Sequence, residues 1–281
     1  MEIPCFQVDA FATRAFEGNP AAVCPVPGPF PDAALMQRIA FENALSETAF
    51  VSRRNDGDHD LRWFTPEHEV DLCGHATLAT AHVLWGELGE TRETLRFHTQ
   101  SGVLTVRARG DLRILDFPSR PPVPAEAPPG LFDALGITRA EVLRSRDLVI
   151  VLAHSDEVRA LRPDLARIGA MQDLFAVSVT ARGTGKDDDV DFVSRFFAPR
   201  EGVPEDPVTG SAHCTLTPLW ASRLGKTTLR ARQVSRRGGE LGCTLAGGPR
   251  LARGPRRPRQ ARDVPRAKRR RQHDRNRCMM K

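Results

Sequence analysis

The chain has 281 residues, of which 40% are hydrophobic and 27% are charged, proportions that are typical of a soluble globular protein. Its length is sufficient for two domains of ordinary size. No apolar run approaches the roughly 20 residues that a membrane span needs. The first residues also lack the basic flank and the long apolar stretch of a secretion signal. We therefore expect a cytoplasmic protein that does not insert into membranes.

The net charge of +6 has its origin at the C-terminal end of the chain. Residues 245–281 contain 12 Arg and 2 Lys against 2 Asp, a net charge of +12, so the remaining 244 residues carry a net charge of −6. An Arg/Pro-rich segment of this kind has too few apolar residues to form a packed core. We expect residues 248–281 to be a disordered tail, produced by a shifted reading frame or acting as a nucleic-acid-binding arm.

The sequence contains no pattern that points to a cofactor. The six cysteines are scattered without a C-x-x-C pair, and the histidines lack the spacing of metal ligands. Neither of the glycine-rich loops that cradle nucleotide phosphates is present. We expect no metal and no organic cofactor.

In the first half, hydrophobic periodicity predicts strands and two helices. Asp32 is a predicted N-cap, and residues 75–86 are apolar on nearly every side, which is typical of a buried helix. The predicted strands are 6–11, 21–24, 47–51, 62–64, 94–98, 102–107 and 114–117, and the predicted helices are 33–43 and 75–86.

A proline-rich stretch from Pro118 to Pro129 is the predicted linker. It separates an N-terminal half, residues 1–120, from a C-terminal half, residues 125–247. The second half has predicted helices near 130–135, near 163–169 and from about 211, and predicted strands at 148–152, 176–180 and 192–197.

Two segments, 63–77 and 196–213, resemble each other. Each has an aromatic strand end, a proline, an acidic loop and a glycine that opens an apolar helix containing a tryptophan; the proline and glycine are 8 residues apart in the first copy and 11 in the second. We interpret this as two related domains facing each other across a cleft, with chance similarity as the alternative. Pro218 should kink the second helix or force a local adjustment.

Gly74 and Gly210 each precede the first turn of a repeated helix. Free N–H groups and the positive end of the helix dipole lie at such a position, and two of them facing one cleft would bind a carboxylate. For either copy alone, an ordinary capped helix is the simpler interpretation. The ionisable candidates have structural alternatives too, namely a solvated strand end for Glu47, a core histidine for His75 and an N-cap for Ser211.

Five motifs make the sequence similar to the phenazine-biosynthesis-like (PhzF) isomerase family. They lie at residues 18–23, 45–50, 71–77, 205–213 and 237–241. The resemblance runs from about Phe6 to Leu245, and after about Gly247 the closing strands of the family are absent from the pattern. It implies the α+β fold of diaminopimelate epimerase, with two pseudo-symmetric halves that are each a curled, mostly antiparallel sheet around a central helix. It also implies that the protein takes part in a biosynthetic process and forms a homodimer.

The resemblance further implies a role for each site residue. Glu47 is the acid/base that takes and returns a proton, and His75, Asp206 and Ser211 are catalytic residues that hold and polarise a small anionic substrate. Substrate-binding positions are Asn19, Gly74 and Gly210.

Two further positions separate this chain from epimerases of the same fold, which use a cysteine from each half on opposite faces of one carbon. Here Cys73 occupies the first of these positions, but Thr209 occupies the second, and its hydroxyl is too weak an acid for that role. We expect an isomerase that uses Glu47 as its one base. The alternatives are an epimerase or racemase with an unrecognised second base, and a ligand-binding or nucleic-acid-binding protein without catalysis.

Overall fold

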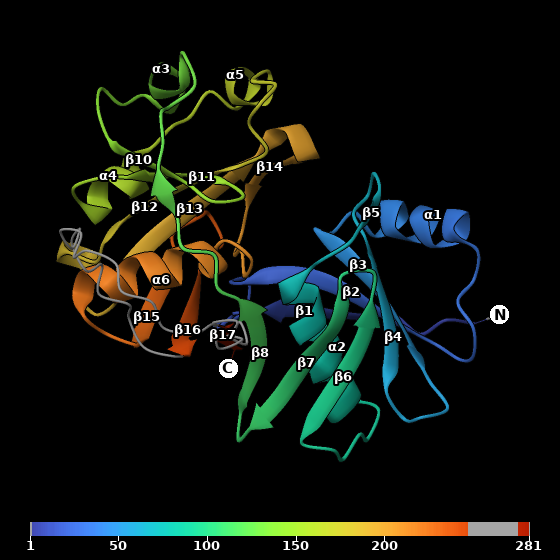
Figure 1. Ribbon diagram of the computed structural model, residues 1–281. Helices are drawn as coiled ribbons and strands as arrows, with labels where there is room; N and C mark the ends of the chain where they lie inside the picture. The colour runs from blue at the N-terminus through green and yellow to red at the C-terminus, as the bar shows by residue number, and fades with distance from the viewer. Residues whose placement is uncertain (1, 247–274, 281) are drawn as a thin grey trace, which may run out of the picture.

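The structure is a computed structural model that describes residues 2–246 and the strand backbone of residues 275–280. Its strands form one 17-stranded mixed sheet, which curls into two halves, each around a central helix (Figure 1). This is the expected α+β architecture. In the described part of the chain, no helix has the length and apolar character needed to cross a bilayer.

The first half has its central helix α2 between the fifth and sixth strands. Its elements in chain order are β1 (Phe6–Ala10), β2 (Asn19–Val26), α1 (Ala33–Asn43), β3 (Glu47–Arg53), β4 (His59–Phe64), β5 (Glu69–Val70), α2 (Gly74–Gly86), β6 (Thr94–Thr99), β7 (Gly102–Arg109) and β8 (Leu112–Pro118).

The second half begins with a short strand inside the predicted linker. Its elements are β9 (Val123–Pro124), α3 (Leu131–Leu135), β10 (Glu141–Arg144), β11 (Leu148–Val151), α4 (Ser155–Ala160), α5 (Leu165–Gly169), β12 (Val177–Arg182), the 3₁₀ turn η1 (Gly185–Asp187), β13 (Phe192–Ala198), the 3₁₀ turn η2 (Pro199–Glu201), β14 (Val203–Asp206), α6 (His213–Leu224), β15 (Thr228–Gln233), β16 (Gly239–Ala246) and β17 (Arg275–Met280).

Strand pairing repeats from one half to the other. In the first half, β1 is antiparallel to β2, β2 is parallel to β3, β3 is antiparallel to β4, β4 is parallel to β6, and β6, β7 and β8 follow antiparallel. The same sequence of parallel and antiparallel neighbours runs from β10 through β11, β12, β13, β15 and β16 to β17. The internal repeat expected from two short segments therefore extends over both halves.

At the end of the chain, six residues of the tail that was expected to be disordered form a strand, β17. β17 pairs antiparallel with β16 of the second half and with β8 of the first, so these six residues join the halves at the place of a closing strand. The sequence pattern missed this strand because its flanks are dominated by arginine and proline, whereas ladder hydrogen bonds are made by the backbone whatever the side chains are. The rest of the predicted tail lies outside the described residues.

One hydrophobic core is shared by the two halves. Phe11, Trp63 and Phe117 belong to the same buried cluster as Phe192 and Trp220. The helix α2 is buried from Gly74 through Ala81, as expected for a helix that is apolar all round. Burial on this scale fixes the start of α2, and with it the first half of the site.

Pro218 lies inside α6, and its consequence is local. Because proline has no N–H, it leaves the carbonyl of Cys214, one turn earlier, without its helical donor. That carbonyl accepts a hydrogen bond from the backbone N–H of Arg120 at 2.9 Å. The local adjustment at Pro218 thus provides a hydrogen bond between the linker and α6.

Candidate active site

Glu47 and His75 form the first part of the site. Glu47 is the first residue of β3 and His75 is the second residue of α2; the Glu47 Oε2 atom lies 3.0 Å from His75 Nε2, with side chains 16% and 6% exposed. A carboxylate and an imidazole at this distance can share or exchange a proton. The structure therefore supports neither a solvated Glu47 nor a His75 that is merely packed in the core.

Cys73 lies at the other nitrogen of the same ring. Its Sγ atom is 3.5 Å from His75 Nδ1, and it is the N-cap residue of α2 without a side-chain capping bond. Donor atoms of Glu47, Cys73 and His75 all lie within 4.8 Å of one another. However, the Cys73 thiol faces Nδ1 of His75, whereas the Glu47 carboxylate faces Nε2. One metal ion can bind only one of these two ring nitrogens. The arrangement suits proton exchange better than metal binding.

Asn19 connects His75 to the second half. The Asn19 side chain is fully buried, and its Nδ2 atom donates to Asp206 Oδ1 at 2.8 Å and to the Val208 carbonyl at 2.9 Å. The same nitrogen lies 3.4 Å from His75 Nδ1. Both amide hydrogens have oxygen acceptors, so the main partner of Nδ1 is the Cys73 sulfur. Asn19 therefore brings Asp206 and His75 into one site.

Gln233 and Thr209 hold Asp206 from its other side, roles that the sequence did not reveal. The Thr209 hydroxyl donates to the Asp206 carboxylate. Gln233 donates to the Asp206 carbonyl at 2.7 Å and accepts the Thr209 N–H at 2.9 Å. The signal that could have found Gln233 is a polar residue at the inward-facing position of an alternating strand, since Leu229, Ala231 and Gln233 are all buried.

The buried charges of the site influence one another. Burial by itself lowers the pKa of His75, but the negative charges of Cys73 and Glu47 and the hydrogen bonds to them outweigh it and raise that pKa well above its ordinary value. Burial raises the pKa of the Cys73 thiol, and the Glu47 carboxylate adds to this effect. Burial also raises the pKa of Asp206, although the His75 charge opposes it. We interpret His75 in the resting state as an imidazolium.

Gly74 and Gly210 lie against the same aromatic ring. A Cβ atom on Gly74 would be 2.5 Å from Phe117 Cζ, and one on Gly210 would be 3.8 Å from Phe117 Cε2. Gly74 starts α2 as expected, whereas α6 starts at His213, after a turn in which the His213 N–H bonds to the Gly210 carbonyl. The group that approaches the Gly74 backbone closely is therefore the protein's own Phe117 ring.

Ser211 is the predicted site residue with the least structural support. It is partly exposed, and within residues 2–246 its side chain makes no hydrogen bond to Glu47, His75 or Asp206. The N-cap of α6 is Ala212, so the alternative interpretation of Ser211 as the N-cap is wrong. Its position matches that of His75 in the repeat.

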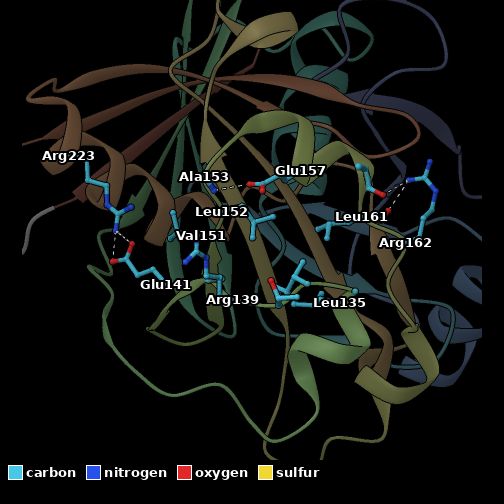
Figure 2. A pocket seen from close by; sticks show the side chains of 15 residues that line it. Leu135, Arg139, Glu141, Val151, Leu152, Ala153, Glu157, Leu161, Arg162 and Arg223 are labelled. Carbon is cyan, nitrogen blue, oxygen red and sulfur yellow. Dashed lines mark hydrogen bonds and ion pairs between the residues drawn. The ribbon is translucent and has the colours of Figure 1, made fainter.

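A large pocket lies away from these residues, in the second half. It holds about 1040 Å³ between α3, β10, β11 and α4, and includes Leu135, Arg139 and Leu152 but none of the predicted site residues (Figure 2). Two of its acidic side chains already have partners, because Glu141 accepts from Arg223 at 2.6 Å and Glu157 accepts from the Ala153 N–H at 3.0 Å.

The two curled halves have the diaminopimelate epimerase-like fold, and where they meet a buried carboxylate–imidazole pair is connected through Asn19 to a second carboxylate. Residues 8–125 and 132–256 match the family described as phenazine biosynthesis-like protein. The chain belongs to this family, as its motifs predicted.

Known proteins support this assignment. An uncharacterized isomerase of Pseudomonas aeruginosa is 54% identical over 247 residues, which make up 88% of this chain and 93% of that protein. The crystal structure of a PhzF-family phenazine biosynthesis protein from Enterococcus faecalis has a TM-score of 0.84 at 42% identity and covers 100% of this chain and 95% of its own. A probable proline racemase from Agrobacterium radiobacter, with a TM-score of 0.59 at 12% identity over 99% of this chain and 90% of its own, shares the fold alone.

Proposed function

We propose that the chain is a cofactor-independent isomerase that moves a proton between two carbons of a small carboxylate-bearing substrate. The observation that carries this proposal is the 3.0 Å contact between Glu47 Oε2 and His75 Nε2. At this distance the carboxylate and the imidazole can exchange a proton, which is the geometry that a general base and its partner require. The relative from Pseudomonas aeruginosa named an isomerase is consistent with this class of reaction.

The position of Cys73 favours an isomerase over an epimerase. Two bases that serve opposite faces of one carbon each lie about 3 Å from it, and so about 6 Å from each other. Donor atoms of Cys73 and Glu47 are within 4.8 Å of one another, which is closer than two such bases would lie, so these two groups do not fit as a pair on opposite faces of one carbon. On the Asp206 side, the Thr209 hydroxyl already donates to that carboxylate.

Proton transfer can then proceed on one face of the substrate. Glu47 accepts a proton from one carbon, the resulting enolate-type anion is delocalised over neighbouring atoms, and the protonated Glu47 returns the proton to a second carbon. His75 and Asp206 hold and polarise the substrate. The backbone N–H groups that begin α2 at Gly74, together with those of the Gly210 turn, supply donors for its carboxylate.

Deuterium exchange tests the proposal. The protein is incubated in heavy water with a panel of small unsaturated carboxylates and amino acids, and products are followed by proton NMR and mass spectrometry. We expect the double bond of one substrate to move, with no effect of EDTA on the rate. Inversion of the exchanging carbon, without movement of a double bond, would instead establish an epimerase.

A further inference from the structure

The turn between β15 and β16 contacts both halves of the site. Gln233, the last residue of β15, holds Asp206 and Thr209. Two residues later, the Ser235 hydroxyl donates to the Pro207 carbonyl at 2.7 Å. On its other side, the Gly238 carbonyl accepts the Gly18 N–H at 2.7 Å. The turn therefore lies between the segment that carries Asp206 and the segment that ends at Asn19.

Arg237 makes the strongest set of contacts in this turn. Its guanidinium donates from Nε to the Gly18 carbonyl at 2.9 Å, and from Nη2 to the Glu17 carbonyl at 3.0 Å and to Asp9 Oδ1 at 2.8 Å. All three partners belong to the first half, although Arg237 belongs to the second. One of these partners, Gly18, is the residue directly before Asn19 in the chain.

The segment that Arg237 holds is conformationally demanding. Phe11 and Phe16 have positive φ angles of 63° and 70°, in the region that residues other than glycine rarely adopt. Gly18, at φ 78°, has no room for a side chain, because a Cβ atom there would lie 2.3 Å from the Ala10 carbonyl. Strained backbone of this kind persists only where the surroundings fix it. Phe11 is buried in the core, and the Glu17 carboxylate accepts hydrogen bonds from Thr13 and Arg14. The contacts of Arg237 fix the end of the segment.

We propose that Arg237 is a positioning residue of the site: by binding the carbonyls of Glu17 and Gly18, it holds the Asn19 amide against Asp206. The two carbonyl bonds matter more than the charge pair. Side chains of Arg237 and Asp9 are each about 30% exposed, and ion pairs that face solvent contribute little. A planar guanidinium can reach both carbonyls at once, whereas the single ammonium of lysine cannot reproduce this geometry.

The test compares Arg237→Gln and Arg237→Lys with Asp9→Asn and with a neighbouring control, Arg236→Gln. Arg236 is exposed, and within residues 2–246 its side chain has no hydrogen bond or ion pair. The first measurement is the solvent-exchange rate of the Asn19 side-chain amide protons by ¹⁵N NMR. We expect both Arg237 variants to raise this rate at least about tenfold, Asp9→Asn to raise it less, and the control to leave it within about twofold.

A second measurement connects the inference to catalysis and rests on the proposed function. Turnover of the substrate found by deuterium exchange should fall about tenfold in kcat in the Arg237 variants, and remain unchanged in the control. An Asn19 amide that stays equally protected in folded Arg237→Lys overturns the inference, as does an unprotected amide with normal turnover. If Arg237→Gln does not fold, Arg237→Lys and Asp9→Asn decide the question. The NMR result stands even if no substrate is turned over.

Discussion

The Asn19 amide of the first half donates to the Asp206 carboxylate of the second half, with Nδ2 and Oδ1 2.8 Å apart. The Asn19 side chain is fully buried and Asp206 is partly buried, so the bond is costly to lose. Because Asn19 also adjoins His75, neither half contains a complete site without the other. Substitutions that disturb the junction of the halves should therefore affect activity before they affect the fold of either half.

Glu47→Gln should abolish turnover and leave the protein folded. The amide keeps the shape of the side chain but cannot accept the substrate proton, so a loss of 10²–10⁴-fold is expected for removal of a general base (an order-of-magnitude range). Deuterium incorporation gives the rate, and a thermal melt gives the stability. A folded Glu47→Gln protein with activity within about threefold of the parent would remove Glu47 from the mechanism.

Cys73→Ala should remain active, within about tenfold of the parent. Donor atoms of Cys73 and Glu47 lie within 4.8 Å of one another, and Cys73 contacts the ring of His75, so its removal loosens an orienting contact and deletes no base. In an epimerase that relies on two thiols, the same change stops the reaction. Complete loss of turnover in folded Cys73→Ala would revive the epimerase alternative.

His75 should titrate well above its ordinary pKa of about 6.5, because the negative charges around it outweigh its burial. A histidine whose folded-state pKa is raised stabilises the folded state fully below the unfolded pKa, and this stabilisation is lost as the pH rises through the folded pKa. Glu47→Gln removes one of the charges and should lower the pKa of His75. NMR titration of the His75 ring in both proteins measures the shift; an equal or higher pKa in Glu47→Gln would contradict the pairing.

Much of this site could be predicted from the sequence, for reasons that differ between residues. Glu47 and His75 lie in motifs on predicted elements, so their local structure followed from periodicity. Gln233 could not be found in that way, because its role depends on the return of β15 beside the Asp206 segment, a long-range contact. Gly74 was expected to leave room for a ligand, but the group that lies nearest to the place of a Cβ atom is the ring of Phe117.

Gly74→Ala should destabilise the fold by about 1–3 kcal/mol, the usual cost of overpacking a core. The new methyl group would lie 2.5 Å from Phe117 Cζ. Phe117→Leu should recover part of this loss, giving a non-additive double-mutant cycle. Gly86→Ala, at the other end of α2, is the matched control, since its added carbon would meet nothing within 4 Å. It should be neutral or slightly stabilising. Equal melting temperatures for the two single variants would show that the ring moves away freely.

Deletion of residues 275–281 should lower the melting temperature, although the composition of the tail indicated that it was dispensable. β17 pairs with β16 and β8 along nearly its whole length, so its removal leaves the backbone groups of two strands without partners. Open edges of this kind also promote association between molecules. A loss of about 2 kcal/mol corresponds to a fall of roughly 4–8 °C for a protein of this size.

A second protein, with residues 248–270 scrambled at constant composition, keeps the length and charge of the connection and should melt like the parent. Thermal melts and analytical ultracentrifugation measure both effects. If the deletion changes neither the melting temperature nor the association state, then β17 does not contribute to the stability of the sheet, and the two halves are held together by their shared core and by the hydrogen bonds between them.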